Sequence, residues 1–143
     1  MYIPRAALEE LNEIPQITYH GMIHPELIDV MMRDTTCVVL PTYYREGVPR
    51  VLLEACASGR PIITTDSVGC RDVVEPGING WKVPSRDVDA LTRAMRECAK
   101  SGPVKLTSLA IGARETVEAR FDEQLVISAY LARLEMASGK KPS

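Results

Sequence analysis

The sequence of 143 residues has no apolar run long enough to cross a bilayer and no excess of basic residues. A membrane-spanning helix needs about 20 consecutive apolar residues, and the N-terminus also lacks the charged and apolar segments of a secretory signal. The net charge of -2 offers no basic surface for a nucleic acid backbone. We therefore expect a cytoplasmic protein that does not bind nucleic acid, and we leave open a peripheral contact of the full-length form with the inner membrane face.

The sequence also lacks closely spaced cysteines, since no C-x-x-C occurs among Cys37, Cys56, Cys70 and Cys98. We interpret these cysteines as reduced thiols rather than as a disulfide framework or a zinc site. His20 and His24 flank Gly21, but no further residue with metal-ligand spacing is near them. We therefore expect structural or loop roles for both histidines and no bound metal.

What the sequence does contain is a repeated alternation of strand and helix patterns. A hydrophobic content of 45% suits one ordinary domain with a real core. We predict strands at 16–21, 36–42, 61–66 and 80–84. We predict helices at 5–12, 24–34, 48–59, 88–100, 108–120 and 123–137, with one helical turn near 72–74. The alternation indicates an α/β fold with a partial Rossmann-like parallel sheet of about four strands, flanking helices and an all-helical C-terminus.

The stretch "YYREGVPRVLLEA" at residues 43–55 follows the second predicted strand, where ligands bind in such sheets. Gly47 lets a ligand approach the backbone, and Pro49 opens a helix without losing a needed donor. The free N–H groups of Val48, Arg50 and Val51 then lie at the positive end of the helix dipole. We predict an anion site here, most plausibly for phosphate.

Two glutamates bracket this anion site, with seven residues between them. An ionised carboxylate only accepts hydrogen bonds, so Glu46, beside the phosphate position, is suited to sugar hydroxyl groups. Glu54, about two turns into the helix, is suited to a ribose diol. The alternative is a solvated helix face, which the preceding apolar strand and the Gly-x-Pro helix start disfavour.

The segment "EGVPRVLLEA" resembles the E-x7-E motif of the retaining family 4 glycosyltransferases, and "ASGRPIITTDSVGCRDVVEPGINGWKVPSRDVDALTRAM" resembles the stretch that follows it there. The likeness extends over about 14–136. It implies the two-domain GT-B fold, in which the first Rossmann-like domain binds the acceptor and the second binds the nucleotide-sugar. By this resemblance, residues 1–143 are a truncated carboxy-terminal donor-binding domain, and the amino-terminal acceptor domain is absent.

The resemblance also implies roles for the motif residues. Glu46 would bind the donor hexose as the catalytic residue, Glu54 would bind the ribose, and the backbone at 47–50 would hold the diphosphate. The partners would be a nucleotide-sugar, most plausibly a UDP-hexose, and a glycan or lipid-linked acceptor, with no cofactor and no metal. The reaction would be hexose transfer with retention. A non-catalytic nucleotide-sugar-binding module is the alternative.

Other positions have less specific interpretations. The loop with Gly69, Cys70 and Arg71 follows the third predicted strand and is a candidate for lining the donor pocket. The resemblance places a glutamate near Asp72, which makes this position an altered match. Arg50 either reaches the phosphate or points to water.

Two features of the last predicted strand favour structural roles. The Asn79-Gly80 pair favours a tight turn. For Trp81 we prefer packing in the core or against a partner domain over stacking on a nucleotide base.

The chain departs from the family pattern at its beginning. The Arg and Lys that would neutralise the diphosphate have no counterpart before residue 16, so we expect little or no transferase activity from this chain alone. The two central strands of the family's sheet are also missing, which would leave strand 36–42 with an open edge. We expect strand 16–21 to pair directly with it; another copy or a missing segment are the alternatives.

Overall fold

The structure is a computed structural model that describes residues 4–124 and 127–128. In chain order its elements are α1 (Arg5–Asn12), α2 (Pro25–Arg33), β1 (Val38–Leu40), α3 (Arg50–Ala57), β2 (Ile62–Thr65), α4 (Cys70–Val73), β3 (Gly80–Val83), α5 (Val88–Lys100) and α6 (Pro103–Arg120). The described strands form one parallel sheet in the order β1-β2-β3. The expected α/β class with a parallel sheet and flanking helices is confirmed.

The predicted strand at 16–21 is wrong, so the described sheet has three strands rather than about four. Every residue of this segment is exposed, including Ile17 and Tyr19. The segment thus packs against no other element, and a strand without a partner and a packed face is not stable in water. As a result, β1 pairs only with β2 among the described residues, and its other edge is open, contrary to our expectation that 16–21 would pair with it.

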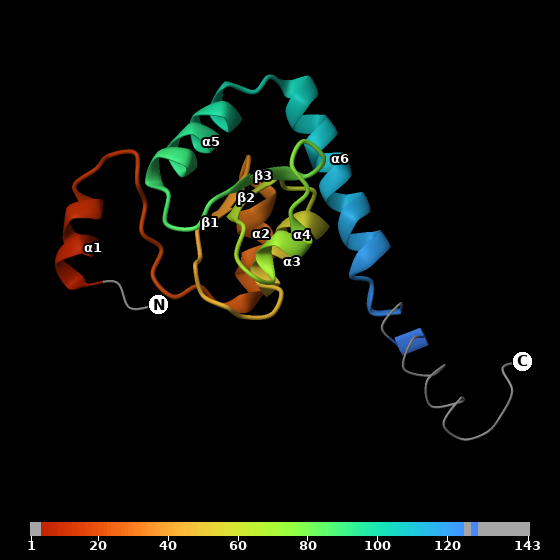
Figure 1. Ribbon diagram of the computed structural model, residues 1–143. Coiled ribbons are helices and arrows are strands. Elements are labelled where there is room, and N and C mark those ends of the chain that lie inside the picture. The colour runs from red at the N-terminus through yellow and green to blue at the C-terminus, as the bar shows by residue number, and fades with distance from the viewer. Residues whose placement is uncertain (1–3, 125–126, 129–143) are drawn as a thin grey trace, which may run out of the picture.

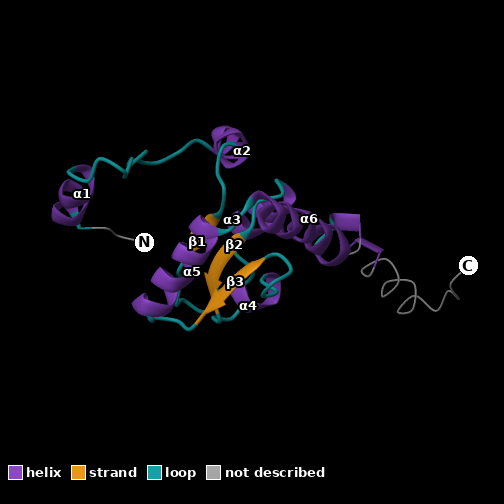
Figure 2. Cartoon of the chain, turned by 90° about the horizontal axis from the view of Figure 1, so that it is seen from above, coloured by secondary structure: helices purple, strands orange, loops and turns teal. Residues whose placement is uncertain are grey.

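Helices cover both faces of the sheet, because successive strand residues point to opposite sides. Ile62 packs in a core with Leu52 and Cys56 of α3, whereas the next residue, Ile63, packs with Ala94 and other residues of α5. Figures 1 and 2 show α5 on one side of the sheet and α3 and α4 on the other. The fold is therefore a three-layer arrangement with the sheet in the middle.

The helix boundaries follow local capping chemistry. Pro49 is the N-cap of α3. Gly59, with a left-handed φ of 64°, follows the C-terminus of this helix, where a glycine in this conformation commonly ends a helix. The Asp87 side chain accepts from the Ala90 amide at 2.8 Å and caps α5.

The last two predicted helices have different outcomes. The helix α6 begins at Pro103 rather than near residue 108, because Gly102 and Pro103 form a favourable helix start. The helix predicted at 123–137 lies mostly outside the described residues.

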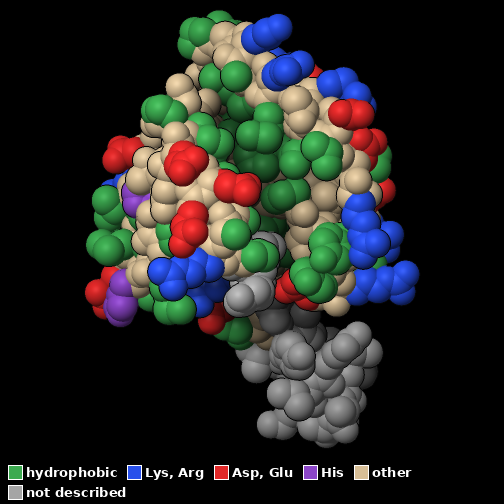
Figure 3. All heavy atoms as spheres, turned by 90° about the vertical axis from the view of Figure 1, so that its left-hand side faces the viewer, with side chains coloured by type: hydrophobic (Ala, Val, Ile, Leu, Met, Phe, Trp, Pro, Cys, Tyr) green, Lys and Arg blue, Asp and Glu red, His purple; other side chains and the backbone are tan. Residues whose placement is uncertain are grey.

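The first helix stands apart from the sheet (Figure 1), and none of its residues is buried. On this side of the molecule, hydrophobic side chains line a hollow strip between charged ones (Figure 3). Exposed large hydrophobic residues near the N-terminus include Ile14, Ile17, Tyr19 and Met22. Among the helices of residues 4–124, none combines the length and apolar character needed to span a membrane.

Candidate functional site

The loops that follow the three strands emerge at one edge of the sheet, since all strands run in the same direction. The loop 41–49 leads from β1 into α3, 66–69 leads from β2 into α4, and 84–87 leads from β3 into α5. Ligands of open parallel sheets bind at this edge. The chain therefore places the motif at residues 43–55 where a binding site is expected.

The N-terminus of α3 offers free backbone donors. The Leu52 amide bonds to the Pro49 carbonyl at 3.1 Å, but the amides of Val48, Arg50 and Val51 have no acceptor among the described residues. A Cβ added to Gly47 would meet no atom within 4 Å. The backbone at this helix start is thus open to a ligand, and its partial positive charge favours an anion.

Gly69 brings the loop after β2 against the motif. Its φ is 85°, and a Cβ added there would overlap the Gly47 carbonyl and lie 2.8 Å from the Glu46 carbonyl oxygen. The two loops therefore touch through backbone atoms. The neighbouring candidates differ, because the Cys70 side chain is fully buried in the core while Arg71 is exposed. The Cys70 side chain is thus excluded as part of the lining of a donor pocket.

Glu54 lies at the edge of α3 in an ion pair. Its Oε1 accepts from Arg50 Nε at 2.7 Å, and its side chain remains 32% exposed. Glu54 and Arg50 line a groove of about 290 Å³ between α2 and α3, which also includes Pro25 and Ile28. The second carboxylate oxygen of Glu54 is left to accept from a ligand, whereas the Arg50 guanidinium is already bonded to Glu54.

Glu46 differs from Glu54 in having no side-chain partner. It lies in the exposed loop before Gly47, and no hydrogen bond or ion pair involves its carboxylate within the described chain. A free carboxylate can accept hydrogen bonds from the hydroxyl groups of a ligand. The anionic part of the same ligand would bind the open backbone amides beside it.

Sequence analysis missed a group of side chains on the other side of the motif loop. The rings of Tyr43 and Tyr44 stack with centroids 4.6 Å apart, and the guanidinium carbon of Arg86 lies 4.4 Å from the Tyr43 centroid. The Tyr43 and Tyr44 hydroxyls share a hydrogen bond at 3.4 Å, and the pKa of Tyr44 is raised above its ordinary value because this pairing favours its protonated form. The two adjacent tyrosines are visible in the sequence and could have indicated this group. The contact with Arg86 could not be predicted, because Arg86 lies in a different loop.

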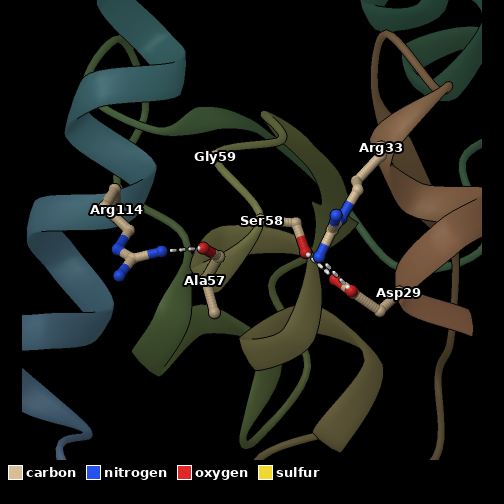
Figure 4. A pocket seen from close by; sticks show the side chains of 6 residues that line it. All are labelled: Asp29, Arg33, Ala57, Ser58, Gly59 and Arg114. Atoms are coloured by element: carbon tan, nitrogen blue, oxygen red, sulfur yellow. Dashed lines mark hydrogen bonds and ion pairs between the residues drawn. The ribbon is translucent and has the colours of Figure 1, made fainter. Parts of the chain in front are cut away.

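A separate pocket of about 460 Å³ lies at the opposite end of α3 (Figure 4). Its two arginines are engaged by protein groups: Arg33 pairs with Asp29 at 2.6 Å, and Arg114 donates to the Ala57 carbonyl at 2.6 Å. Arg114 thus bonds a carbonyl at the negative end of the helix. We interpret this pocket as a place where α2, α3 and α6 are held together.

The turn before β3 is structural, as predicted. Asn79 is fully buried, donates to the Val73 carbonyl at 2.8 Å and accepts from the Glu75 amide at 2.7 Å. Trp81 is half-buried against the core beneath α5, with Lys105 Nζ 5.6 Å from its ring centroid. Within residues 4–124 and 127–128, no three His, Cys, Asp or Glu side chains are grouped as metal ligands.

Solved structures share this arrangement. The sucrose-phosphate synthase of Thermosynechococcus elongatus matches 93% of the chain with a TM-score of 0.78 and 30% identity, over 33% of its own length. A structure of Anabaena HepE in complex with UDP-glucose matches 94% of the chain with a TM-score of 0.75 and 22% identity, over 35% of its length. These matches confirm the domain fold of GT-B glycosyltransferases.

Sequence comparisons agree with the structural ones. The putative colanic acid biosynthesis glycosyltransferase WcaL of Salmonella typhimurium is 32% identical over 137 residues, which are 92% of the chain and 32% of WcaL. The chain spans about a third of the length of such curated relatives. The model of the family "Glycosyl transferases group 1" matches residues 3–101, more than half of the chain. The chain therefore belongs to the group 1 glycosyl transferases.

Proposed function

We propose that this chain binds a nucleoside diphosphate sugar, most plausibly a UDP-hexose, at the N-terminus of α3. The observation that carries this proposal is the set of amides at Val48, Arg50 and Val51, which have no acceptor within the described part of the chain and are bracketed by the carboxylates of Glu46 and Glu54. Free amides at a helix N-terminus are suited to bind the diphosphate. The two carboxylates are suited to accept hydrogen bonds from the hydroxyl groups of the hexose and the ribose, which flank the diphosphate.

Each part of the donor has a place in this arrangement. The diphosphate bonds to the free amides of α3 where Gly47 leaves the backbone open. The hexose hydroxyls bond to Glu46, and the ribose bonds to the free oxygen of Glu54 at the groove between α2 and α3. Support also comes from HepE, a protein of the same fold whose structures contain UDP and UDP-glucose.

The proposed chemistry is hexose transfer with retention to a glycan or lipid-linked acceptor. The chain would act mainly by stabilising the departing diphosphate on the α3 amides and by orienting the hexose through Glu46. No metal or cofactor takes part. This domain corresponds to the carboxy-terminal donor-binding part of an enzyme that also has an acceptor domain, so we expect little or no transfer by the 143 residues alone.

Calorimetric titration of the chain with UDP tests the proposal. We expect Glu54→Gln to weaken UDP binding about tenfold, as loss of a charge-assisted hydrogen bond does. The matched control is Glu118→Gln, because Glu118 forms the same i,i+4 ion pair with Arg114 on α6, away from the site. Absence of UDP binding, or equal effects of the two substitutions, would contradict the proposal.

A further inference from the structure

The segment 43–46 of the motif loop ends in Glu46 but has few backbone contacts of its own. Near its start, the Tyr44 amide donates to the Thr42 hydroxyl at 3.3 Å, and just after its end Gly47 lies against the loop that follows β2. Between these points, no backbone hydrogen bond within the described chain involves Glu46. The position of this glutamate therefore depends on the side chains that precede it.

These side chains form a stack that ends on an arginine of another loop. The rings of Tyr43 and Tyr44 are stacked with their centroids 4.6 Å apart, and both side chains are about half exposed. The Arg86 guanidinium carbon lies 4.4 Å from the Tyr43 centroid. A cation over a partly exposed tyrosine ring changes an equilibrium constant by a factor of about three. Arg86 thus joins the segment 43–46 to the loop before α5.

The backbone of Arg86 is strained and is fixed on both sides. Its φ of 64° is a left-handed conformation that is unfavourable for a residue with a side chain. The Ser85 amide and hydroxyl each donate to Asp66 at 3.1 Å, and Asp87 caps the first turn of α5. Such strain persists where the surrounding structure over-determines it, and it is common at functional sites.

The contact with Tyr43 is what this strained position provides. No carboxylate within the described residues forms an ion pair with the Arg86 guanidinium. The neighbouring Asp87 carboxylate is engaged by the Ala90 amide at 2.8 Å. The arginine side chain is therefore directed to the aromatic ring rather than to an acidic partner.

We propose that Arg86 is a positioning residue for the donor hexose: it holds Tyr43 and thereby the loop segment that presents the Glu46 carboxylate. The inference rests on the proposed function, because it concerns the same donor site. Arg86 acts through the ring, so it needs no contact of its own with the donor. Glu54 lies on α3 and does not depend on this contact. Loss of the contact should therefore weaken binding of the hexose rather than binding of the nucleotide.

Calorimetric titration with UDP-glucose and with UDP tests this division. Arg86→Gly removes the cation, and glycine adopts the left-handed backbone without strain, so the fold is retained. We expect this variant to bind UDP-glucose about threefold more weakly and UDP with unchanged affinity. Arg86→Lys keeps a cation for the ring and should retain both affinities. Arg93→Ala is the control for the lost charge, because Arg93 is exposed on α5 and should leave the ratio of the two affinities unchanged.

A double-variant cycle tests whether Arg86 acts through the ring. Tyr43→Phe keeps the ring and should bind UDP-glucose normally. Tyr43→Leu removes the ring and should weaken UDP-glucose about threefold, with no further loss when Arg86→Gly is added.

Limited trypsin digestion followed by mass spectrometry gives a readout that needs no ligand. Trypsin cleaves after Arg45, inside the held segment, and its rate follows the population of the open loop. We expect cleavage at this bond to be about threefold faster in Arg86→Gly and unchanged in Arg86→Lys. Faster cleavage without any binding of UDP would contradict the proposed function alone.

Four results would overturn the inference. They are an unchanged ratio of UDP-glucose and UDP affinities in Arg86→Gly, a changed ratio in Arg86→Lys, a further loss in the double variant, and unchanged cleavage after Arg45 in Arg86→Gly.

Discussion

At the scale of single residues, the two glutamates of the motif are in different states. Glu54 is held by Arg50 at 2.7 Å, which fixes its carboxylate on the edge of α3 before any ligand arrives. Glu46 lies in an exposed loop, and its carboxylate has no partner in the part of the chain that the structure describes. A ligand that uses both therefore meets one preorganised acceptor and one that must be ordered on binding, at a cost of about 0.5–1.5 kcal/mol for an immobilised side chain.

Gly69 is the residue that ties the motif loop to the rest of the site. We expect Gly69→Ala to lower the free energy of unfolding by about 2–3 kcal/mol, because it adds strain at φ 85° and overlaps the Gly47 carbonyl. Displacement of the motif loop should also weaken UDP binding. Urea unfolding and calorimetry measure the two effects.

Gly77→Ala is the control for Gly69→Ala. Gly77 has a similar φ of 79°, but an added Cβ meets no atom within 4 Å. This variant should therefore carry only the backbone strain, about 1 kcal/mol, with normal UDP binding. If the two variants were equally stable, the contact between the loops would not be what Gly69 preserves.

At the scale of elements, α6 supports the site from behind by packing on α3 and on the turn before β3. A Cβ at Gly112 would overlap the Ile78 carbonyl oxygen and lie 2.9 Å from its carbonyl carbon. This close approach lets the helix cover the turn that Asn79 holds from inside. The close packing of α6 on this turn therefore depends on one small residue at its crossing point.

Substitution of this glycine tests the role of α6. Alanine normally stabilises a helix by about 1 kcal/mol relative to glycine, yet we expect Gly112→Ala to destabilise the chain by about 2 kcal/mol because the backbone of the turn must move. Thermal unfolding followed by circular dichroism measures the change. The control, Ser108→Ala, is on an exposed position of the same helix and should be neutral or slightly stabilising. Stabilisation by both substitutions would contradict the close packing.

Elements with strong local signals were predictable from the sequence. Pro25 and Asp87 mark helix starts, and the apolar runs around Val38 and Ile62 are strands, since these signals depend on nearby residues alone. The prediction of a strand at 16–21 was wrong because a strand is stable only when it pairs with another strand, which the local sequence does not reveal. Likewise, the motif identified Glu46 and Glu54 as candidate site residues. The contact of Arg86 with Tyr43 was not predictable, because it joins the loops that follow two different strands.

At the scale of the whole molecule, the open edge of β1 is a consequence of the missing strand pairing. Val39, in the middle of this strand, is 36% exposed, and an unpaired apolar edge favours pairing with another chain. We expect the chain to self-associate as its concentration rises, and Val39→Lys to reduce this association. Sedimentation velocity measures it.

Val104→Lys is the control for the edge substitution, because Val104 is exposed on α6 and not on a strand. It adds the same charge to the molecule and should leave self-association unchanged. A chain that stays monomeric at all concentrations, or that responds equally to both lysines, would show that the β1 edge is not the contact surface.

The central claim is that consecutive parts of one helix start bind the hexose, the diphosphate and the ribose. The most direct measurement is the ratio of the affinities for UDP-glucose and UDP, determined by calorimetry for the unmodified chain, Glu46→Gln and Glu54→Gln. We predict that Glu46→Gln weakens UDP-glucose about tenfold and leaves UDP unchanged, whereas Glu54→Gln weakens both ligands by the same factor. Equal losses for both ligands in Glu46→Gln would contradict the claim.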